Sequence, residues 1–271
     1  MHFGLEVIPF GDYADPCSVI ELAQAAEQAG WEGLWLWDHM LMPYGAGDPW
    51  VTLSGVAATT QRLKLVTGVS PLPRYYPQNL ARLLTGLDLL SQGRLVLGAG
   101  LGSVDEEFTR FGLPSEKSIR AEMLDESLQI ITRLWSGETL DFQGQYYSVG
   151  GAALQPRPVQ QPRPPVWIGG ESPPALRRAA RWDGWVTGVI DENASIVRTP
   201  EQLTRDLAYI QAHRQSQAPF EVAIDGVSQP GEGNLAQAYA EAGATWWFEA
   251  IYGLRGNTAE MLERVKAGPP V

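Results

Sequence analysis

The sequence is poor in the residues that mark several common protein classes. Its 271 residues include one cysteine, Cys17, and three histidines. One cysteine cannot form a disulfide framework or a cysteine-based metal cluster within the chain. Basic residues are also scarce, since 20 Lys and Arg stand against 31 Asp and Glu, for a net charge of -11. Such a surface repels nucleic acid and anionic lipid, so we expect no nucleic-acid partner and no membrane partner.

Long apolar runs are missing as well. No stretch approaches the roughly 18 consecutive apolar residues of a membrane helix. The opening MHFGLEVIPF lacks the basic segment and long apolar core of a signal peptide, so a cytoplasmic location is expected. The composition, 44% hydrophobic over 271 residues, is enough for one large core. We therefore expect a single domain over residues 1–271.

The sequence does contain a repeated alternation of short apolar runs and longer amphipathic segments, which is typical of a parallel sheet with a helix after each strand. The predicted strands are 2–8, 33–39, 63–71, 94–102, 165–170, 184–189, 220–228 and 245–252. The predicted helices are 18–30, 50–60, 77–93, 118–137, 172–182, 199–215, 234–244 and 257–268. Eight strand–helix pairs favour an α/β fold of the (β/α)8 TIM barrel type. The alternative is an open doubly wound sheet, for which one GxG at 98–100 is weak support.

The ends of the helices carry local signals. Ser18, with Glu21 three residues later, predicts the N-terminal cap of the first helix. Thr199 followed by Pro200 predicts the start of the sixth. The alternation lapses once, at residues 138–165, which are rich in Gly, Pro and Gln. We interpret this stretch as a short excursion between helix 4 and strand 5 that contains a small hairpin.

A polar pair ends the second predicted strand. The run LWLWDHML places Asp38 and His39 directly after apolar residues. Because the C-terminal ends of barrel strands form the active-site face, these side chains are expected to line the mouth of the barrel. His39 is the best placed of the three histidines for acid–base chemistry. The alternative is structural, with the pair capping the next loop.

Small residues follow two other strands. The third predicted strand runs through Gly68, Val69 and Ser70, and the fourth contains Gly98 and Gly100. Small residues at a barrel mouth allow a flat ring to lie against the backbone. Glycines also serve simply to ease tight turns, and that alternative stays open.

The fifth predicted strand ends in a possible anion site. Gly169 and Gly170 are followed by Ser172 and a helix that carries Arg177 and Arg178. Exposed N–H groups at a helix N-terminus, reached through a glycine turn, bind phosphate. The two arginines either add positive charge to this site or pair with solvent and acids elsewhere.

Several longer stretches form an ordered set along nearly the whole chain. They are WEGLWLWDH (31–39), RLKLVTGVSPLPRYYPQNLARLLTGLDLLSQGRLVLGAGLG (62–102), EEFTRFG (106–112), LWSGE (134–138), QPRPVQQPRPPVWIGG (155–170) and ALRRAARWDGWV (175–186). This set resembles the luciferase-like flavin-dependent oxidoreductases. That superfamily includes bacterial luciferase, alkanesulfonate monooxygenase, and enzymes that use the deazaflavin coenzyme F-420.

The resemblance implies a barrel whose mouth holds FMN or the deazaflavin coenzyme F-420. It implies that Asp38 and His39 are catalytic and lie beside the ring, with His39 as hydrogen-bond donor or acid–base group. It also implies a non-proline cis peptide at the end of the third strand, as family members often have. Together with the strand ends, it predicts these cofactor-binding residues: Gly68, Val69, Ser70, Gly98, Gly100, Gly169, Gly170 and Ser172. No metal site is expected.

The sequence departs from one branch of this family. Ser103 stands where the sugar-phosphate dehydrogenases have a catalytic Glu, which puts that substrate in doubt. Glu107 matches a Glu-Phe pair of the broader family and is interpreted as structural. The acidic tail of a deazaflavin needs a basic groove, for which Arg74, Arg157 and Arg163 are candidates. The alternative is that these three arginines are solvated loop charges.

The expected function is flavin- or deazaflavin-dependent oxidation or reduction of a small organic molecule. Reduced FMN implies monooxygenation with O2 and a flavin reductase as partner, whereas the deazaflavin implies hydride transfer. Trp50, Tyr75 and Tyr76, in predicted loops, suggest an apolar or aromatic substrate. The family analogy leaves a homodimer open.

Two other functions compete with this one. The first is a flavin-binding protein of the same fold without turnover. The second is a metal-dependent barrel hydrolase, which needs several acids or histidines at strand ends. The candidates for such a metal site are Glu6, Asp38, His39, Asp225 and Glu249.

Overall fold

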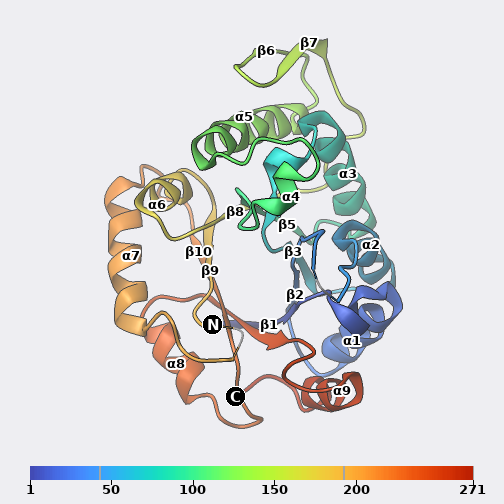
Figure 1. The fold of residues 1–271 in the computed structure, drawn as a ribbon, viewed down its shortest axis with the longest axis vertical. Coiled ribbons are helices and arrows are strands. Elements are labelled where there is room, and N and C mark those ends of the chain that lie inside the picture. The colour runs from blue at the N-terminus through green and yellow to red at the C-terminus, as the bar shows by residue number, and fades with distance from the viewer. Residues whose placement is uncertain (43, 192, 271) are drawn as a thin grey trace.

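Eight parallel strands close into a barrel in the computed structural model, which describes residues 1–42, 44–191 and 193–270 (Figure 1). In order around the barrel they are β1 (His2–Val7), β2 (Gly33–Leu36), β3 (Lys64–Thr67), β5 (Leu95–Gly100), β8 (Val166–Gly169), β9 (Gly184–Thr187), β10 (Glu221–Gly226) and β11 (Trp246–Ile251). Because β1 pairs with both β2 and β11, the sheet has no edge. The predicted TIM barrel is confirmed, and the open doubly wound sheet is excluded.

Helices surround the barrel, and each predicted helix has a counterpart. They are α1 (Pro16–Gln28), α2 (Pro49–Thr59), α3 (Pro77–Leu90), α5 (Lys117–Trp135), α6 (Pro173–Ala179), α7 (Pro200–His213), α8 (Asn234–Glu241) and α9 (Thr258–Lys266). Three short elements were not predicted: η1 (Gly11–Ala14), η2 (Leu72–Arg74) and α4 (Glu106–Thr109). The predicted third strand is divided into β3 and the short β4 (Ser70–Pro71). No helix of the described residues is both long and apolar enough to span a bilayer.

Proline sets the start of several helices. The predicted cap at Ser18 is wrong, because α1 begins two residues earlier at Pro16. Asp15 is the cap, and its carboxylate accepts a hydrogen bond of 2.9 Å from the Cys17 backbone N–H. Proline fits the first helical position because its ring fixes φ and its missing N–H has no helical partner there. Thr199 caps α7 as predicted and forms a capping box with Gln202.

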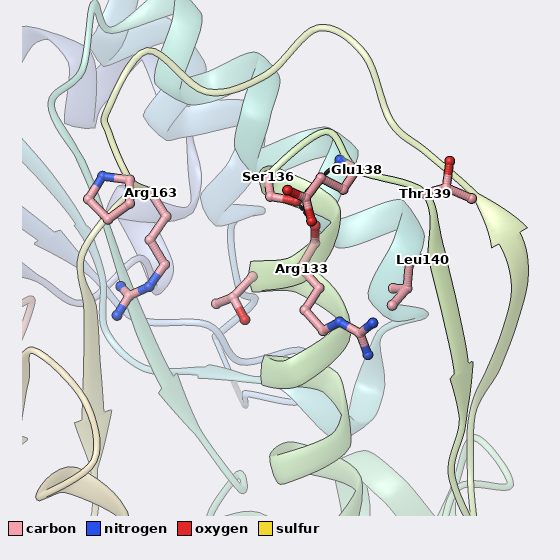
Figure 2. Close-up of a pocket in the computed structure, with 8 residues that line it drawn as sticks. Arg133, Ser136, Glu138, Thr139, Leu140 and Arg163 are labelled. Carbon is pink, nitrogen blue, oxygen red and sulfur yellow. Dashed lines mark hydrogen bonds between the residues drawn. The ribbon is translucent and has the colours of Figure 1, made fainter.

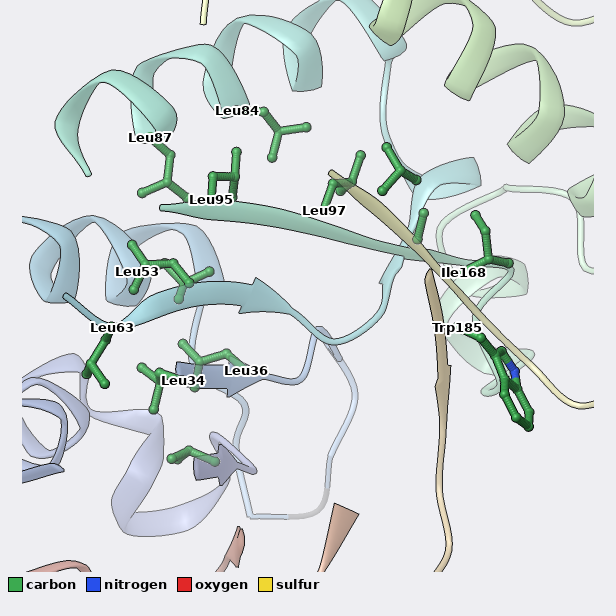
Figure 3. Packing of buried hydrophobic residues seen from close by; sticks show 14 of the residues in the cluster. Leu34, Leu36, Leu53, Leu63, Leu84, Leu87, Leu95, Leu97, Ile168 and Trp185 are labelled. Carbon is green, nitrogen blue, oxygen red and sulfur yellow. The ribbon is translucent and has the colours of Figure 1, made fainter. Parts of the chain in front are cut away.

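The main hydrophobic core lies between the barrel and its helices. Alternate residues of each strand point outward, as the two-residue period of a strand requires. In Figure 3, Leu95 and Leu97 on β5 face Leu84 and Leu87 on α3. All four side chains are buried, so this packing fixes the helix against the strand.

The interior of the barrel has its own, smaller core, rich in aromatic side chains. Trp35, Trp167, Trp246 and Phe248 fill it together with smaller residues from the other strands. Trp246 and Phe248 stack with their ring centroids 5.3 Å apart. The barrel is therefore a packed core over most of its height, and polar chemistry is confined to its ends.

The predicted excursion leaves the barrel between α5 and β8. It contains an antiparallel hairpin of β6 (Leu140–Gln143) and β7 (Ser148–Ala152), which lies beyond α5 at the top of Figure 1. Glu126 on α5 holds this hairpin, because its carboxylate accepts hydrogen bonds from three successive backbone N–H groups, those of residues 145–147.

Candidate functional site

Four charged or titratable side chains meet at the mouth, which we define as the C-terminal end of the barrel strands. Asp38 and His39 follow β2, Arg74 ends η2, and Glu107 lies in α4. The Arg74 guanidinium donates to an Asp38 carboxylate oxygen and, at 2.5 Å, to Glu107. His39 Nδ1 lies 3.1 Å from the other Glu107 oxygen. We call these four residues the mouth ion cluster.

Backbone geometry explains why these side chains converge. β2 ends at Leu36, so Trp37 and His39 continue the inward-pointing side of the strand beyond its last hydrogen bond. The Glu107 oxygen that faces His39 also accepts from the Met40 and Leu41 backbone N–H groups, at 2.6 and 3.0 Å. A carboxylate contributed by α4 therefore holds the loop that follows β2.

The two carboxyl groups of the cluster differ in their electrostatics. Burial raises the pKa of Asp38, although Arg74 and the Tyr75 hydroxyl, which donates to it at 2.8 Å, oppose that shift. Burial acts in the same direction on Glu107, but the Leu41 and Met40 N–H groups, followed by His39 and Arg74, outweigh it and lower the pKa of Glu107. Glu107 is therefore the stably ionised partner of His39.

A bulge interrupts the wall of the barrel after β3. The peptide bond between Gly68 and Val69 is cis, as the family resemblance implied. A Cβ on Gly68 would lie 1.1 Å from Trp35 Nε1, which donates to the Gly68 carbonyl at 2.6 Å. Ser70 follows in β4, and its buried Oγ lies beside Asp38 without a hydrogen bond of normal geometry. The bulge thus places Val69 and Ser70 at the mouth.

The glycines of β5 and β8 make room for this bulge. A Cβ on Gly100 would lie 2.5 Å from Val69 Cγ2, and one on Gly169 would lie 2.8 Å from Val69 Cγ1. A Cβ on Gly98 would meet the Thr67 carbonyl oxygen at 1.8 Å. These three positions therefore require glycine for packing alone. Their predicted contact with a cofactor stays a prediction.

Two further acids point into the barrel just below the mouth. Glu6 on β1 is 1% exposed and Asp225 on β10 is 6% exposed. Glu6 accepts from Trp37 Nε1 at 2.6 Å, and Asp225 accepts from the Val189 backbone N–H at 2.6 Å. Burial, followed by the charge of Asp225, raises the pKa of Glu6 well above its ordinary value. Burial raises the pKa of Asp225 to about 6. We call Glu6 and Asp225 the interior acid pair.

Comparison with known proteins agrees with this arrangement. The profile of the luciferase-like monooxygenase family matches residues 8–266. The chain belongs to that family. An F-420-dependent glucose-6-phosphate dehydrogenase of Nakamurella multipartita is 37% identical over 182 residues, 64% of this chain and 52% of that protein. An F-420-dependent hydroxymycolic acid dehydrogenase of Mycobacterium tuberculosis is 34% identical over 178 residues, 63% of this chain and 49% of that protein.

The chain thus spans about half the length of these curated relatives. Among solved structures, the oxygenating constituent of 3,6-diketocamphane monooxygenase from Pseudomonas putida, in complex with FMN, has a TM-score of 0.80. It is 15% identical, and the match covers 98% of this chain and 96% of that chain. This likeness supports the barrel fold of the luciferase-like family.

The predicted anion site of this luciferase-like barrel has few donors. Ser172 caps α6, but its side chain makes no capping hydrogen bond. Pro173 and Pro174 have no N–H, so only Ala175 among the first three helical residues can donate one. Glu171 adds a carboxylate beside Gly170, where it pairs with Arg198 and accepts from the Thr187 hydroxyl. Phosphate binding by Gly169, Gly170 and Ser172 remains a prediction.

The candidate arginines are engaged elsewhere. Arg178 pairs with Asp125 on α5, and Arg177 donates to the Tyr209 hydroxyl. The proposed basic groove is wrong for Arg74, which is buried between the two acids of the mouth ion cluster. Arg163 precedes β8 and pairs with Asp183, which precedes β9. This salt bridge therefore lies at the N-terminal end of the barrel. For Arg178, the alternative of pairing with an acid elsewhere is the one that the structure shows.

The predicted pocket-wall aromatics lie behind the mouth ion cluster. Trp50 is not in a loop but in the first turn of α2, where it is 6% exposed. Its Nε1 donates to the Tyr75 hydroxyl at 3.1 Å, and that hydroxyl donates to Asp38. Both side chains therefore support Asp38. Tyr76 is exposed to solvent.

A pocket of about 320 Å³ lies away from the mouth (Figure 2). It is lined by the C-terminal end of α5 and the flanks of the excursion: Thr132, Arg133, Ser136, Glu138, Thr139, Leu140, Pro162 and Arg163. Residues 162 and 163 precede β8, so this pocket belongs to the N-terminal face of the barrel. That face serves stability in TIM barrels, and of the predicted binding residues only the groove candidate Arg163 lines this pocket.

The metal-dependent alternative gains no support from the geometry. Within the described part of the chain, no three His, Cys, Asp or Glu side chains are placed to hold a metal ion. Glu249 points out of the barrel, where it pairs with Arg255 at 2.6 Å and accepts from the Ser228 hydroxyl. It is therefore separated from the acids inside.

Proposed function

We propose that this protein is an oxidoreductase that transfers hydride between the deazaflavin coenzyme F-420 and a small alcohol or carbonyl compound. The observation that carries the proposal is the orientation of His39, whose Nδ1 is held by an ionised carboxylate at the mouth. The names of the two curated relatives, both F-420-dependent dehydrogenases, support the choice of cofactor and reaction.

The residues at the mouth fit such a cofactor. The Val69 bulge presents an apolar surface against which a flat ring can lie, and the buried Ser70 hydroxyl adds a polar atom beside Asp38. When bound, the deazaflavin supplies the hydride acceptor or donor of the reaction. Gly68, Val69 and Ser70 would lie against the ring, while Gly98, Gly100 and Gly169 keep the bulge in position.

His39 has a defined proton-transfer role in this proposal. With its Nδ1–H donating to Glu107, a neutral imidazole carries its lone pair on Nε2. An alcohol that is oxidised to a carbonyl loses a hydride from carbon and a proton from oxygen. Nε2 can accept that proton, and it can return a proton to a carbonyl oxygen in the reverse reaction. Glu107 positions the ring and stabilises the imidazolium, as the carboxylate does in other His–carboxylate pairs.

Asp38 has a supporting role in this proposal, although it was predicted to be catalytic. Its carboxylate receives Arg74 and the Tyr75 hydroxyl, and it is 4% exposed. A buried carboxylate with these partners orients its neighbours and does not reach a reacting atom. Its contribution is to hold Arg74 between itself and Glu107.

A second cofactor is favoured by the description of the matching family, which is a family of monooxygenases. Reduced FMN would make the protein the oxygenating component of a system that needs a flavin reductase. Calorimetric titration of the protein with coenzyme F-420 and, separately, with FMN decides between the two. We expect the deazaflavin to bind more tightly; tighter binding of FMN would favour monooxygenation, and binding of neither would refute both.

Replacement of His39 tests the assignment of the base. His39→Ala should lower the rate of deazaflavin reduction by an alcohol at least about 100-fold, the usual contribution of a general base. His213, on the exposed face of α7, provides the matched control, because His213→Ala makes the same change away from the mouth. Equal rates for His39→Ala and wild type, measured by cofactor absorbance, would remove His39 from the mechanism.

A further inference from the structure

The interior acid pair differs from most other buried acids of this protein. Asp38, Glu107 and Glu249 each pair with a buried arginine, which is Arg74 for the first two and Arg264 for Glu249. Neither Glu6 nor Asp225 pairs with a Lys, Arg or His within the described residues. Two carboxyl groups inside a barrel without a cation are costly, because a buried charge needs a partner or must be neutralised.

One oxygen of each carboxyl group is left for a ligand. Trp37 Nε1 donates to Glu6 Oε1, and the Val189 backbone N–H donates to Asp225 Oδ1. Glu6 Oε2 and Asp225 Oδ2 make no hydrogen bond with any described residue. A Cβ added to Gly188, at the end of β9, would meet Asp225 Oδ2 at 3.5 Å and no other atom within 4 Å outside its chain neighbours. Gly188 therefore leaves room for at least a methyl-sized group beside Asp225 Oδ2.

Aromatic faces complete this side of the mouth. Trp37 links Glu6 to His39, since the centroids of the Trp37 and His39 rings are 5.7 Å apart. Phe10, from the loop after β1, lies 6.2 Å from Trp37 and 6.0 Å from His39 by ring centroids. Aromatic faces beside carboxylates are the usual recognition chemistry for an organic ammonium group.

The surrounding charges disfavour an anion at this place. Glu171 lies close enough to Asp225 to raise the pKa of that carboxyl further, after the larger effect of burial. The neighbouring Arg198 is already paired with Glu171 and Asp206. A phosphorylated or carboxylate ligand would therefore meet three carboxyl groups, whereas a cation would relieve their mutual repulsion.

We propose that Glu6 and Asp225 form a subsite beside Gly188 that binds the protonated amine of an organic substrate. The ammonium group donates to Glu6 Oε2 and Asp225 Oδ2, and its carbon skeleton lies against Trp37 and Phe10, within reach of His39. The role of this subsite in turnover rests on the proposed oxidoreductase function. Binding of an amine to this subsite does not depend on that function. The subsite and the proposed function can therefore be refuted separately.

Calorimetric titration of the whole protein with benzylamine at about pH 7.5 tests the proposal, because a primary amine is protonated there. Benzyl alcohol and benzoate, of similar shape, are the neutral and anionic comparisons. The variants are Glu6→Gln and Asp225→Asn, which keep the acceptors for Trp37 and Val189 but remove the charges. Gly188→Ala fills the open space with a methyl group at ordinary contact distance. Glu221→Gln, at the opposite end of β10, is the matched control.

The proposal predicts that benzylamine binds wild type and Glu221→Gln at least tenfold more tightly than the alcohol or benzoate. Each of the three mouth variants should weaken amine binding at least tenfold while keeping the thermal melting temperature near that of wild type. No preference for the amine, or a preference that survives all three substitutions, would overturn it. Parallel titrations with coenzyme F-420 and FMN report on the proposed function independently.

Discussion

Two groups of buried acids lie at the same mouth and differ in one respect, the presence of a cation. The mouth ion cluster places Arg74 between Asp38 and Glu107. Among the described residues, the interior acid pair has a tryptophan N–H and two backbone N–H groups, those of Val189 and Ile190, as its donors. In the cluster, backbone N–H groups, followed by His39 and Arg74, lower the pKa of Glu107, while burial raises the pKa of Asp38 against the opposing charge of Arg74. In the interior acid pair, burial raises the pKa of both Glu6 and Asp225.

This difference suits the mouth ion cluster to positioning other groups and the interior acid pair to binding a ligand. A cluster whose charges are already compensated gains little from a ligand, and its hydrogen bonds hold the loop after β2 in place. A pair of acids without compensation has the most to gain from a cation or a proton. Raised carboxyl pKa values in a cleft are typical of binding and catalytic sites, although structural acids can show them too.

Removal of the Arg74 cation should cause the largest loss of unfolding free energy. Arg74→Met leaves Asp38 and Glu107 buried without their arginine, and we expect it to cost about 3–5 kcal/mol of unfolding free energy. Urea denaturation measures this loss. Lys266→Ala is the control, because Lys266 pairs with Glu263 on the surface and such pairs contribute about 0–1 kcal/mol. A loss below about 1 kcal/mol for Arg74→Met would mean that the cluster is not held by charge.

Neutralising one acid of each group should lower the free energy of unfolding by unequal amounts. Glu107→Gln removes a charged acceptor from Arg74 and two backbone N–H groups, which should cost about 2–3 kcal/mol. Glu6→Gln retains an acceptor for Trp37 and removes a repulsive charge, so its effect should stay within about 1 kcal/mol. Both are measured by urea denaturation at neutral pH. Equal losses would erase the distinction between the two groups.

The pH dependence of stability should differ between wild type and Asp225→Asn. The folded-state pKa of Asp225 is raised from 3.8 to about 6, so the native state holds a proton over this range that the unfolded chain releases. The stability from this group is present at low pH and is lost as pH rises toward 6, by an amount on the order of 3 kcal/mol. Burial is the largest cause of this shift, and the charge of Glu171 adds to it.

Urea denaturation between about pH 4 and 7 provides the measurement. The free energy of Asp225→Asn minus that of wild type should rise with pH, because the variant lacks the titrating group. Glu107 acts with the opposite sign in both proteins, since its lowered pKa gives stability that is lost as pH falls. Taking the difference cancels that contribution, and a flat difference would contradict the raised pKa of Asp225.

The architecture follows from local sequence patterns to a large extent. All eight barrel strands and their helices lie within the predicted ranges or a residue or two beyond. Errors fall where a short element depends on contacts with distant residues. The third strand was predicted as one run, but it ends at Thr67, bulges at Gly68 and Val69, and resumes as β4. The helix α4 has only four residues, about one turn, so no hydrophobic period could reveal it in the sequence.

The candidate site was predicted only in part. Asp38 and His39 lie at the mouth as expected, because a residue that follows a barrel strand must emerge there. The partner of His39 was missed: Glu107 was interpreted as structural, and it is 68 residues away in the chain. Whether the candidate arginines would be available to an anion was left open, and the structure pairs Arg74 and Arg178 with acids from other elements.

The sequence alone determined the barrel, its mouth and the family, because hydrophobic period, helix caps and strand-end motifs are local properties of the chain. Only the tertiary structure decided which acids are compensated. Glu6 and Asp225 come from opposite ends of the chain, and closure of the sheet through β11 brings them to the same side of the barrel. Burial and the distance to a cation set their charge state, and neither quantity exists before the chain has folded.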